Sequence, residues 1–510
     1  MEGAAPAMPN CGPSKERWNF MATQDFLHGV ETLSTAVSQP LVSVDLSTIG
    51  LIGTAPGADP AAFPLNTPVL VSGSDAVLVG KLVSQLPAAQ GGTPNLNPSQ
   101  AGTLPMAVST ILDECSPVMV VVRVEEGSSE SATIANIMGG VDAQGNYTGV
   151  HAFQAAEAIT GRRPRLLCAP GWSHQSVAEA LVSIQVAEGG SGYTPGLYHL
   201  TITDSAGTGA QASATVDSTG KVASVTLLSN GAGYKAPSFA LPAAAGQGTG
   251  ASFSASIATI DNGVVAELKT IAEKLRAVIF ADSADQGQAA AIAAAAMGGG
   301  RVMLIDPWIV RDDGTGTSVT FPASGKFAAK QAYLDQAVGF WRSVSNQPLN
   351  GVTALSRPIG FVVSDQSCAA NLLNAAYVST IIRQAGRGYT TWGNRALDGS
   401  FLCVTRTVDE VNETLLQSVL QFVDMNIVKN FVTEVVEAVN AYLRQLKSKG
   451  AITGGKCWAD TALNTPEAVM NGQVFFDFDI GPAYPAERIT FRSAINNDYV
   501  TTIFNNGSAA

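Results

Sequence analysis

Between about residues 46 and 365, short continuous apolar runs alternate with segments whose apolar residues recur at helical spacing. Continuous apolar runs are typical of parallel strands buried on both faces, with helices covering the sheet. The pattern therefore predicts an α/β domain. The expected strands are residues 118–124, 165–169, 277–282, 301–306 and 359–365, and the clearest expected helices are residues 173–185 and 265–276.

A second helical pattern runs from Val408 to Lys449 and breaks at Asp424–Asn426, which predicts a pair of amphipathic helices. Acidic residues stand near its start and basic residues near its end, before Gly450: Asp409, Glu410 and Glu413, then Arg444, Lys447 and Lys449. This order suits the helix macrodipole and a glycine C-cap. The same charges could instead form a surface for a partner, and the pattern favours neither interpretation.

Strand periodicity returns near the C-terminus, in the stretch VFFDFDIGPAYPAERITFR. Apolar and polar residues alternate on both sides of the prolines, which predicts strands at Phe475–Ile480 and Ile489–Ile495. Two further extended segments are expected, one within Val37–Asp45 and one where Tyr499, Thr501 and Ile503 alternate. From the pattern alone, an ordinary intramolecular hairpin is the simpler expectation.

An internal repeat interrupts the α/β pattern. GSGY at 190–193 recurs as GAGY at 231–234, and GTGA at 207–210 recurs at 248–251; 231 − 190 and 248 − 207 both give 41. The copies are rich in small residues and short alternating runs, so we expect a duplicated β-module inserted at residues 187–258 and facing solvent. A neutral decoration is the simpler interpretation, and a surface module that binds glycans is the alternative.

Composition is that of a globular chain: 510 residues that are 46% hydrophobic provide cores for two to four domains. No apolar run is long enough to predict a membrane span. The net charge of −12 argues against a nucleic-acid partner. Six scattered cysteines without a CxxC pair indicate reduced thiols rather than a zinc site or a disulfide framework. Residues 1–20 lack periodicity and are expected to be a disordered leader, and Met21 could be the true start.

Three expected strands end in aspartate, at Asp282, Asp306 and Asp365. Ligands bind beyond the carboxyl ends of such strands, so a metal-dependent hydrolase is conceivable. An aspartate there is also an ordinary helix N-cap, and with four histidines and no HExxH, GxSxG or GxxxxGK[ST] motif in the chain, capping is the favoured interpretation. We expect no enzymatic activity, no cofactor and no metal.

Several longer stretches, in one order along Phe26 to Tyr499, resemble the tail sheath proteins of contractile-tailed bacteriophages, in the branch of P2-like and Mu-like phages. They are FLHGVE, NTPVLV, VVVRVEEG, TTWGNRAL, VNAYLRQLKSKGAI, LNTPEAVMNGQVFFDFDI and PAERITFR. The leader and the duplicated insert depart from the family.

The resemblance implies a structural subunit that stacks as hexameric rings around a tail tube and contracts to drive the tube through the host envelope. Implied partners are copies of itself, the tail tube protein, and baseplate and tail terminator proteins, with no nucleic acid and no membrane insertion; the implied location is the virion tail, after assembly in the host cytoplasm. The family's central domain is subtilisin-like without protease function, and the chain lacks the HGT motif that contains the catalytic histidine of a subtilisin.

The implied organisation combines this fold with an α+β inner domain and the Gly-rich β insert. It is a leader at 1–20, an N-terminal arm at 21–45, a subtilisin-like outer α/β domain at 46–375 holding the insert at 187–258, an inner domain at 376–495 and a C-terminal arm at 496–510. In the family, terminal arms of neighbours add strands to a third subunit's inner domain. The residues expected in this exchange are Leu41, Val42, Val44, Phe476, Phe478, Ile489, Phe491 and Tyr499, and those expected to face the tube are Arg444, Lys447 and Lys449.

Overall fold

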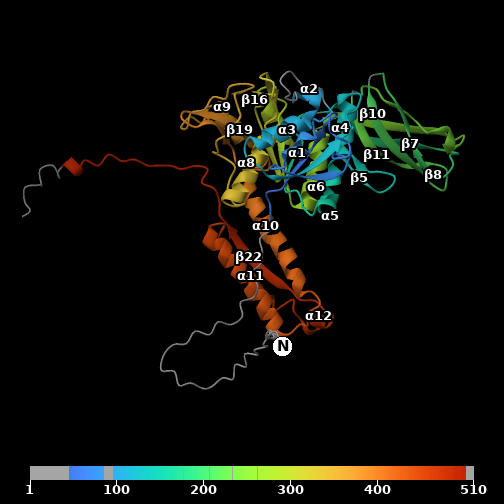
Figure 1. Ribbon diagram of the computed structural model, residues 1–510. Coiled ribbons are helices and arrows are strands. Elements are labelled where there is room, and N and C mark those ends of the chain that lie inside the picture. Colours follow the sequence, from blue (N-terminus) through green and yellow to red (C-terminus); the bar gives the residue numbers. More distant parts are fainter. Residues whose placement is uncertain are drawn as a thin grey trace, which may run out of the picture.

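The computed structural model describes residues 45–85, 96–175, 177–205, 207–232, 234–260 and 262–500. Figure 1 shows an α/β body, a green β-module projecting from one side, and an orange and red C-terminal region that extends away from the body. Among the described residues, no helix combines the length and the apolar character that crossing a membrane requires.

The body is built on an eight-stranded sheet with the order β2-β3-β1-β6-β14-β15-β19-β20. The six central strands are parallel, and β2 and β20 pair antiparallel at the two edges. In chain order the strands are β1 Ile49–Thr54, β2 Pro68–Ser72, β3 Val118–Val124, β6 Leu166–Cys168, β14 Val278–Asp282, β15 Val302–Ile305, β19 Val378–Gln384 and β20 Gly388–Trp392. The mixed α/β class and the strands expected at 118–124, 165–169, 277–282 and 301–306 are confirmed.

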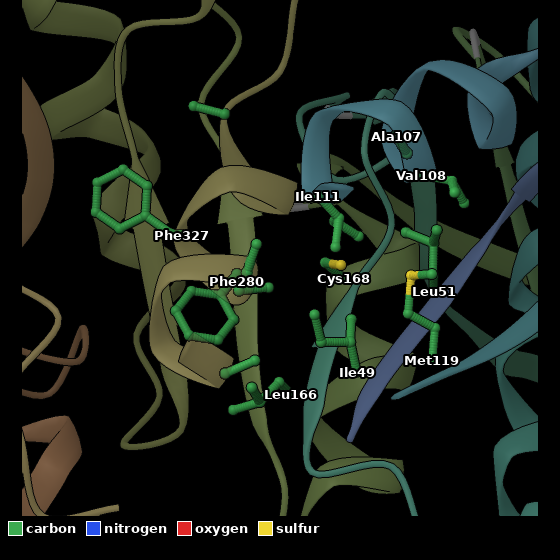
Figure 2. Close-up of a cluster of buried hydrophobic side chains, with 14 of the residues drawn as sticks. Ile49, Leu51, Ala107, Val108, Ile111, Met119, Leu166, Cys168, Phe280 and Phe327 are labelled. Carbon is green, nitrogen blue, oxygen red and sulfur yellow. The ribbon is translucent and has the colours of Figure 1, made fainter. Parts of the chain in front are cut away.

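Helices cover both faces of this sheet, so its strands are apolar on both sides. On one face, α3 (Thr103–Leu112) and α8 (Ser324–Ala337) pack against Ile49, Leu51 and Phe280, and Figure 2 shows Ile111 of α3 and Phe327 of α8 over the strand residues. On the other face lie α4 (Glu130–Met138), α6 (Gly263–Leu275), α7 (Gln288–Ala294) and α9 (Ala369–Ala375).

Short elements complete the body. They are α1 Ala76–Gly80, α2 Pro98–Ala101, β4 Gly140–Val141, β5 Tyr147–Thr148, η1 Gly149–Ala155, α5 Ala156–Thr160, η3 Ala295–Met297, and the side sheet of β16 Ile309–Asp312, β17 Ser318–Phe321 and β18 Ala354–Leu355.

Two secondary-structure expectations, a strand at 359–365 and a helix at 173–185, are wrong. Residues 359–365 are irregular, with a turn at 363–364, and form no strand. Val362 and Val363 are exposed, because a short apolar run does not by itself establish a buried strand. The strand that pairs with β15 at this end of the sheet is β19 instead. Since β19 and β20 belong to the main sheet, the sheet continues past residue 375, and we place the domain boundary within residues 393–401.

The helix expected at 173–185 is also absent, because β7 (Val177–Ser191) occupies most of that range. The ladder to β13 pairs Ser183 with Ser256 and Leu181 with Ile257, and skips Val182. This β-bulge turns both Leu181 and Ile184 into the core of the module, while Val182 is exposed. The apolar spacing of three residues, typical of a helix, here comes from a bulged strand.

The inserted module runs from β7 to β13, so it spans residues 177–260 rather than 187–258. Its other elements are β8 Gly196–His199, β9 Thr201–Thr203, β10 Thr208–Val216, β11 Val222–Ala232, β12 Ser238–Ala240, η2 Ala243–Ala245 and β13 Thr249–Ile260. The first strand of each repeat pairs with the last strand of the other repeat, as β7 with β13 and β11 with β10. The two repeats are therefore intertwined.

The repeated motifs explain this exchange. The Tyr234 ring lies so close to Gly207 that a Cβ on this glycine would meet it at 2.4 Å, and the Tyr193 ring lies equally close to Gly248, at 2.3 Å. Each tyrosine belongs to one repeat and its glycine to the other. The Tyr234 hydroxyl also accepts a hydrogen bond from the backbone N–H of Ala210, at 3.0 Å. The GxGY and GTGA motifs thus lock the two copies together reciprocally.

The C-terminal region contains the expected helix pair, with a break between the helices. Its elements are α10 Leu402–Val419, η4 Leu420–Phe422, α11 Lys429–Lys449, β21 Ile452–Ala459, α12 Pro466–Met470 and β22 Phe476–Pro482. The strands β21 and β22 form an antiparallel two-stranded sheet whose apolar face packs against α10 and α11.

Candidate functional site

The joint between the α/β body and the C-terminal region is held by buried ion pairs along α10. Glu413 is 4% exposed and lies 2.8 Å from Arg163 Nη1 and 3.1 Å from Arg165 Nη2. One turn earlier, Asp409 accepts a hydrogen bond of 2.9 Å from Arg301 Nη2. All three arginines come from the body, so these charges fasten α10 to it.

A second group of buried charges extends this joint. Arg406 donates to Asp335 Oδ1 of α8 at 2.8 Å and to the carbonyl of Leu46 at 3.2 Å. Burial raises the pKa of Asp335, and the Arg406 guanidinium opposes that rise. Farther along α10, Glu410 accepts hydrogen bonds from Tyr442 of α11 and from Thr414. Removing one partner of such a buried pair costs about 3–5 kcal/mol, because the other charge is left desolvated.

This joint corrects the sequence interpretation of Asp409, Glu410 and Glu413. We expected them at a helix start, either serving the macrodipole or forming a surface, but α10 begins at Leu402 and all three are buried within it. The arginine partners of Asp409 and Glu413 stand at 163–301 in the chain, which helical spacing cannot reveal. These acids are therefore structural, but through buried ion pairs and hydrogen bonds rather than through the macrodipole, and their interpretation as a partner surface is wrong.

The basic residues at the end of α11 do lie on the surface. Arg444, Lys447 and Lys449 are exposed, and Arg444 makes an ion pair of 3.5 Å with the equally exposed Glu437. The neighbouring Tyr442, Leu443 and Leu446 are buried in a cluster with Leu46 and Phe340 of the body. The bases thus lie at the end of α11 nearest the body, and their expected contact with a tube stays a prediction.

The two-stranded sheet of β21 and β22 has free edges among the described residues. Phe476 and Phe478 alternate with Asp477 and Asp479, as expected, and pack partly buried against the helices. The partner of β22 is β21 rather than residues 489–495, so the intramolecular hairpin across the prolines is wrong. An unpaired strand edge can accept another strand.

A clasp fixes the chain directly after β22. Arg395 binds both carboxylate oxygens of Glu487, with Nε at 3.0 and 3.1 Å, and stacks 4.0 Å from the centre of the Phe401 ring. Phe401 in turn makes an edge contact with Tyr484. We call Arg395, Phe401, Tyr484 and Glu487 the arm clasp.

Beyond the arm clasp, residues 488–500 form the described C-terminal arm, which runs away from the rest of the molecule in Figure 1. Its large apolar side chains are strongly exposed: Ile489 70%, Phe491 93%, Ile495 95% and Tyr499 72%. Residues 489–495 are not a strand in the single chain, contrary to expectation, because no strand of the described residues pairs with them. Thr501, Ile503, Leu41, Val42 and Val44 lie outside the described residues.

The strand-end aspartates serve structure. Asp282 accepts a hydrogen bond of 2.8 Å from the backbone N–H of Ser324, so it caps α8, and burial raises the pKa of Asp282 to about 7. Asp306 is buried against Arg357 and Ser283 and caps no helix. Asp365 lies in a turn and binds Ser367. Within the described ranges, no three His, Cys, Asp or Glu side chains come together as a candidate metal site.

The joint and the arm clasp are the structural features of this region that the sequence did not predict. TTWGNRAL and PAERITFR contain Arg395 and Glu487, so the clasp joins two of the stretches quoted above. The order of these stretches along the chain does not show that the two are in contact in the folded protein. The one sequence signal for this contact was that one stretch contains Arg395 and the other contains Glu487, which carry opposite charges.

Comparison with known proteins gives one family and a consistent set of relatives. Residues 398–496 match the family model described as the phage tail sheath C-terminal domain. The chain is 26% identical to the tail sheath protein of Escherichia phage P2 and 29% identical to that of Burkholderia phage BcepMu, in each case over 94% of this chain and 98% of the relative.

Solved structures agree in fold. The helical sheath of the anti-feeding prophage in the contracted state matches with a TM-score of 0.54 at 14% identity, over 92% of this chain and all of that one. The sheath complex of an extracellular contractile injection system, also contracted, matches with the same TM-score at 13% identity, over 94% of this chain.

Proposed function

The chain is related over nearly its whole length to the tail sheath proteins of contractile-tailed bacteriophages, and we propose that it forms the contractile sheath around a tail tube. It is a structural subunit of the virion tail. The observation that carries the proposal is the collinear relationship, which includes the arm as well as the folded domains. We further propose that the body is a subtilisin-like domain without protease function.

We propose that the chain has no catalytic role. The buried aspartates at the strand ends, Asp282 and Asp306, are engaged with Ser324, Ser283 and Arg357, contacts that hold the body together. A metal-dependent hydrolase would need these carboxylates free to coordinate. The hydrolase alternative therefore has no observation in its favour.

Contraction requires subunits to move while staying connected. The ion pairs of α10 join the body and the C-terminal region into a single mechanical unit, whereas the described arm beyond Glu487 is strongly exposed. We propose that subunits move as whole units and that the arms maintain the connections, because backbone hydrogen bonds of an added strand tolerate such movement.

The specific connection we propose is strand exchange. Residues 489–499 of one subunit add to the free edge of the β21–β22 sheet of a second subunit, and an N-terminal arm with Leu41, Val42 and Val44 of a third completes that sheet. Phe476 and Phe478 then belong to the acceptor and Ile489, Phe491 and Tyr499 to the donor. Support comes from the free edge among the described residues and from the exposed alternating apolar side chains of the arm.

Partners beyond the chain itself follow from the same proposal: a tail tube protein inside the sheath, and baseplate and tail terminator proteins at its ends, joined during assembly in the host cytoplasm. The inserted module projects from the body (Figure 1), so we place it on the outer surface of the sheath. A glycan-binding role for this module stays an alternative to a neutral decoration.

Purified full-length protein is expected to assemble into long striated tubes, visible by negative-stain electron microscopy. Tube formation should increase with protein concentration, because a tube grows by association of identical subunits. The same contacts are then repeated around each ring and along the tube. A monodisperse monomer under every assembly condition tested would refute the sheath function.

Charge reversal at the end of α11, as the double variant Arg444→Glu and Lys447→Glu, is expected to reduce sheath formation around tail tubes about tenfold, since screened surface charges set partner recognition. The unfolding temperature should stay unchanged because both side chains are exposed. Lys429→Glu, at the opposite end of the same helix, is the control. Equal assembly of all three proteins would show that the two bases do not face the tube.

A further inference from the structure

A cavity of about 750 Å³ opens at the carboxyl ends of β1, β3 and β6. Thr54 ends β1, Gly127 follows β3 and Gly171 follows β6, and all three line it. The chain places β3 on one side of β1 and then crosses to place β6 on the other. Open α/β sheets bind ligands at such a reversal, so the cavity occupies the position where this architecture holds small molecules or side chains.

Aromatic rings form a section of the wall. The indole N–H of Trp172 donates to Thr103 Oγ1 at 3.0 Å, and that of Trp308 donates to the carbonyl of Ser283 at 2.8 Å. Both N–H groups are thus engaged within the protein. A ligand can therefore contact the two tryptophans through their ring faces. These faces carry negative π-density and attract cations.

The charged groups of the wall are acidic. Glu126 and Glu130 line the cavity and are exposed, and no lysine or arginine of the described residues lines it. His174 also lines the cavity, in edge contact with Trp308 at 4.9 Å between ring centres, and burial lowers the pKa of His174. The imidazole is therefore neutral at pH 7 and adds no positive charge. An anionic ligand would face two carboxylates without a counter-charge.

We propose that this cavity binds a primary ammonium or guanidinium group carried on an aliphatic stem. Glu126 and Glu130 neutralise the cation and the Trp172 and Trp308 rings contact the stem and the charged head. The site is separate from the free sheet edge and the C-terminal arm, so it goes beyond the sheath function and does not depend on it.

Calorimetric titration of the full-length protein tests this site with two cations, the tripeptide acetyl-Gly-Arg-Gly-amide and spermidine. We expect binding of at least one, weakened about tenfold or more by the double variant Glu126→Gln and Glu130→Gln, which keeps size and leaves the fold intact because both side chains are exposed. Tighter binding of the tripeptide assigns the site to a side chain of another polypeptide, and tighter binding of spermidine assigns it to a free polyamine.

Two controls make the result specific. Glu125→Gln removes an exposed charge next to Glu126 that does not line the cavity, and should leave affinity unchanged. A tripeptide with citrulline in place of arginine keeps the shape without the charge, and should not bind. Failure of both cations to bind, equal binding of the citrulline peptide, or unchanged affinity in the double variant would each overturn the proposal.

Discussion

Removal of residues 488–510 is expected to abolish tube formation while leaving the subunit folded. The cut lies directly after the arm clasp, so the Arg395–Glu487 contacts and the β21–β22 sheet remain. The described portion of the deleted arm is strongly exposed and adds little to the single subunit. In a tube, burying each large apolar side chain would stabilise the contact by about 1.5–3 kcal/mol. Electron microscopy and thermal unfolding of the same preparation measure the two effects.

Point variants separate strand addition from loose apolar contact. In an added strand, successive side chains point to opposite faces. Phe491→Asp should therefore abolish tubes, whereas Thr490→Asp, one position away, should be tolerated. Tubes that persist after truncation, or equal loss from both point variants, would show that the arm does not act as an exchanged strand.

Deleting one repeat of the inserted module is expected to be more damaging than deleting the whole module. Joining Val186 to Leu228 removes one 41-residue period and leaves a single GxGY and a single GTGA motif. The joined strand can still pair with β13, but the deletion removes β8, β9, β10 and most of β11. The strand β12 then lacks its partner β9, and the module core loses Leu200, Ala212, Ala214, Val216 and Val222. The module should lose its own melting transition, or recruit a second chain and form dimers.

Excision of residues 177–260 with a short Gly-Gly linker is the matched comparison. Asn262 donates to the carbonyl of Trp172 at 3.0 Å, so the two ends of the module already lie close together on the body. The body should keep its unfolding temperature within about 3 °C. Calorimetry and analytical ultracentrifugation distinguish the outcomes. A monomeric single-repeat protein with an intact module transition would contradict the intertwined arrangement, as would unfolding of the body after complete excision.

Local patterns in the sequence predicted much of the fold. Apolar runs such as 118–124 located central strands, and the 41-residue period located the insert. Patterns failed where distant residues decide the outcome. The bulge at Val182 gave β7 a helical spacing, and the pairing with β13 determined its structure.

In the candidate site, too, local patterns were predictive and contacts between distant residues were not. The alternation of Phe476 and Phe478 correctly predicted a strand, since one face of it is buried within the chain. The burial of Glu413 could not be predicted, because its three arginine partners come from two distant segments of the body, at 163–165 and at Arg276, and its own sequence surroundings are those of an amphipathic helix. Ion pairs between distant segments carry no periodic signal.

The arm clasp gives the C-terminal arm a fixed origin, and this makes the arm a tether of defined length. From Glu487 to Val500 the chain adds thirteen residues, which span at most about 45 Å when fully extended. In the proposed exchange, the acceptor edge of the neighbouring subunit must lie within that radius of the clasp before, during and after contraction. The clasp and the arm together thus set an upper limit on how far two linked subunits can separate along any path the sheath takes.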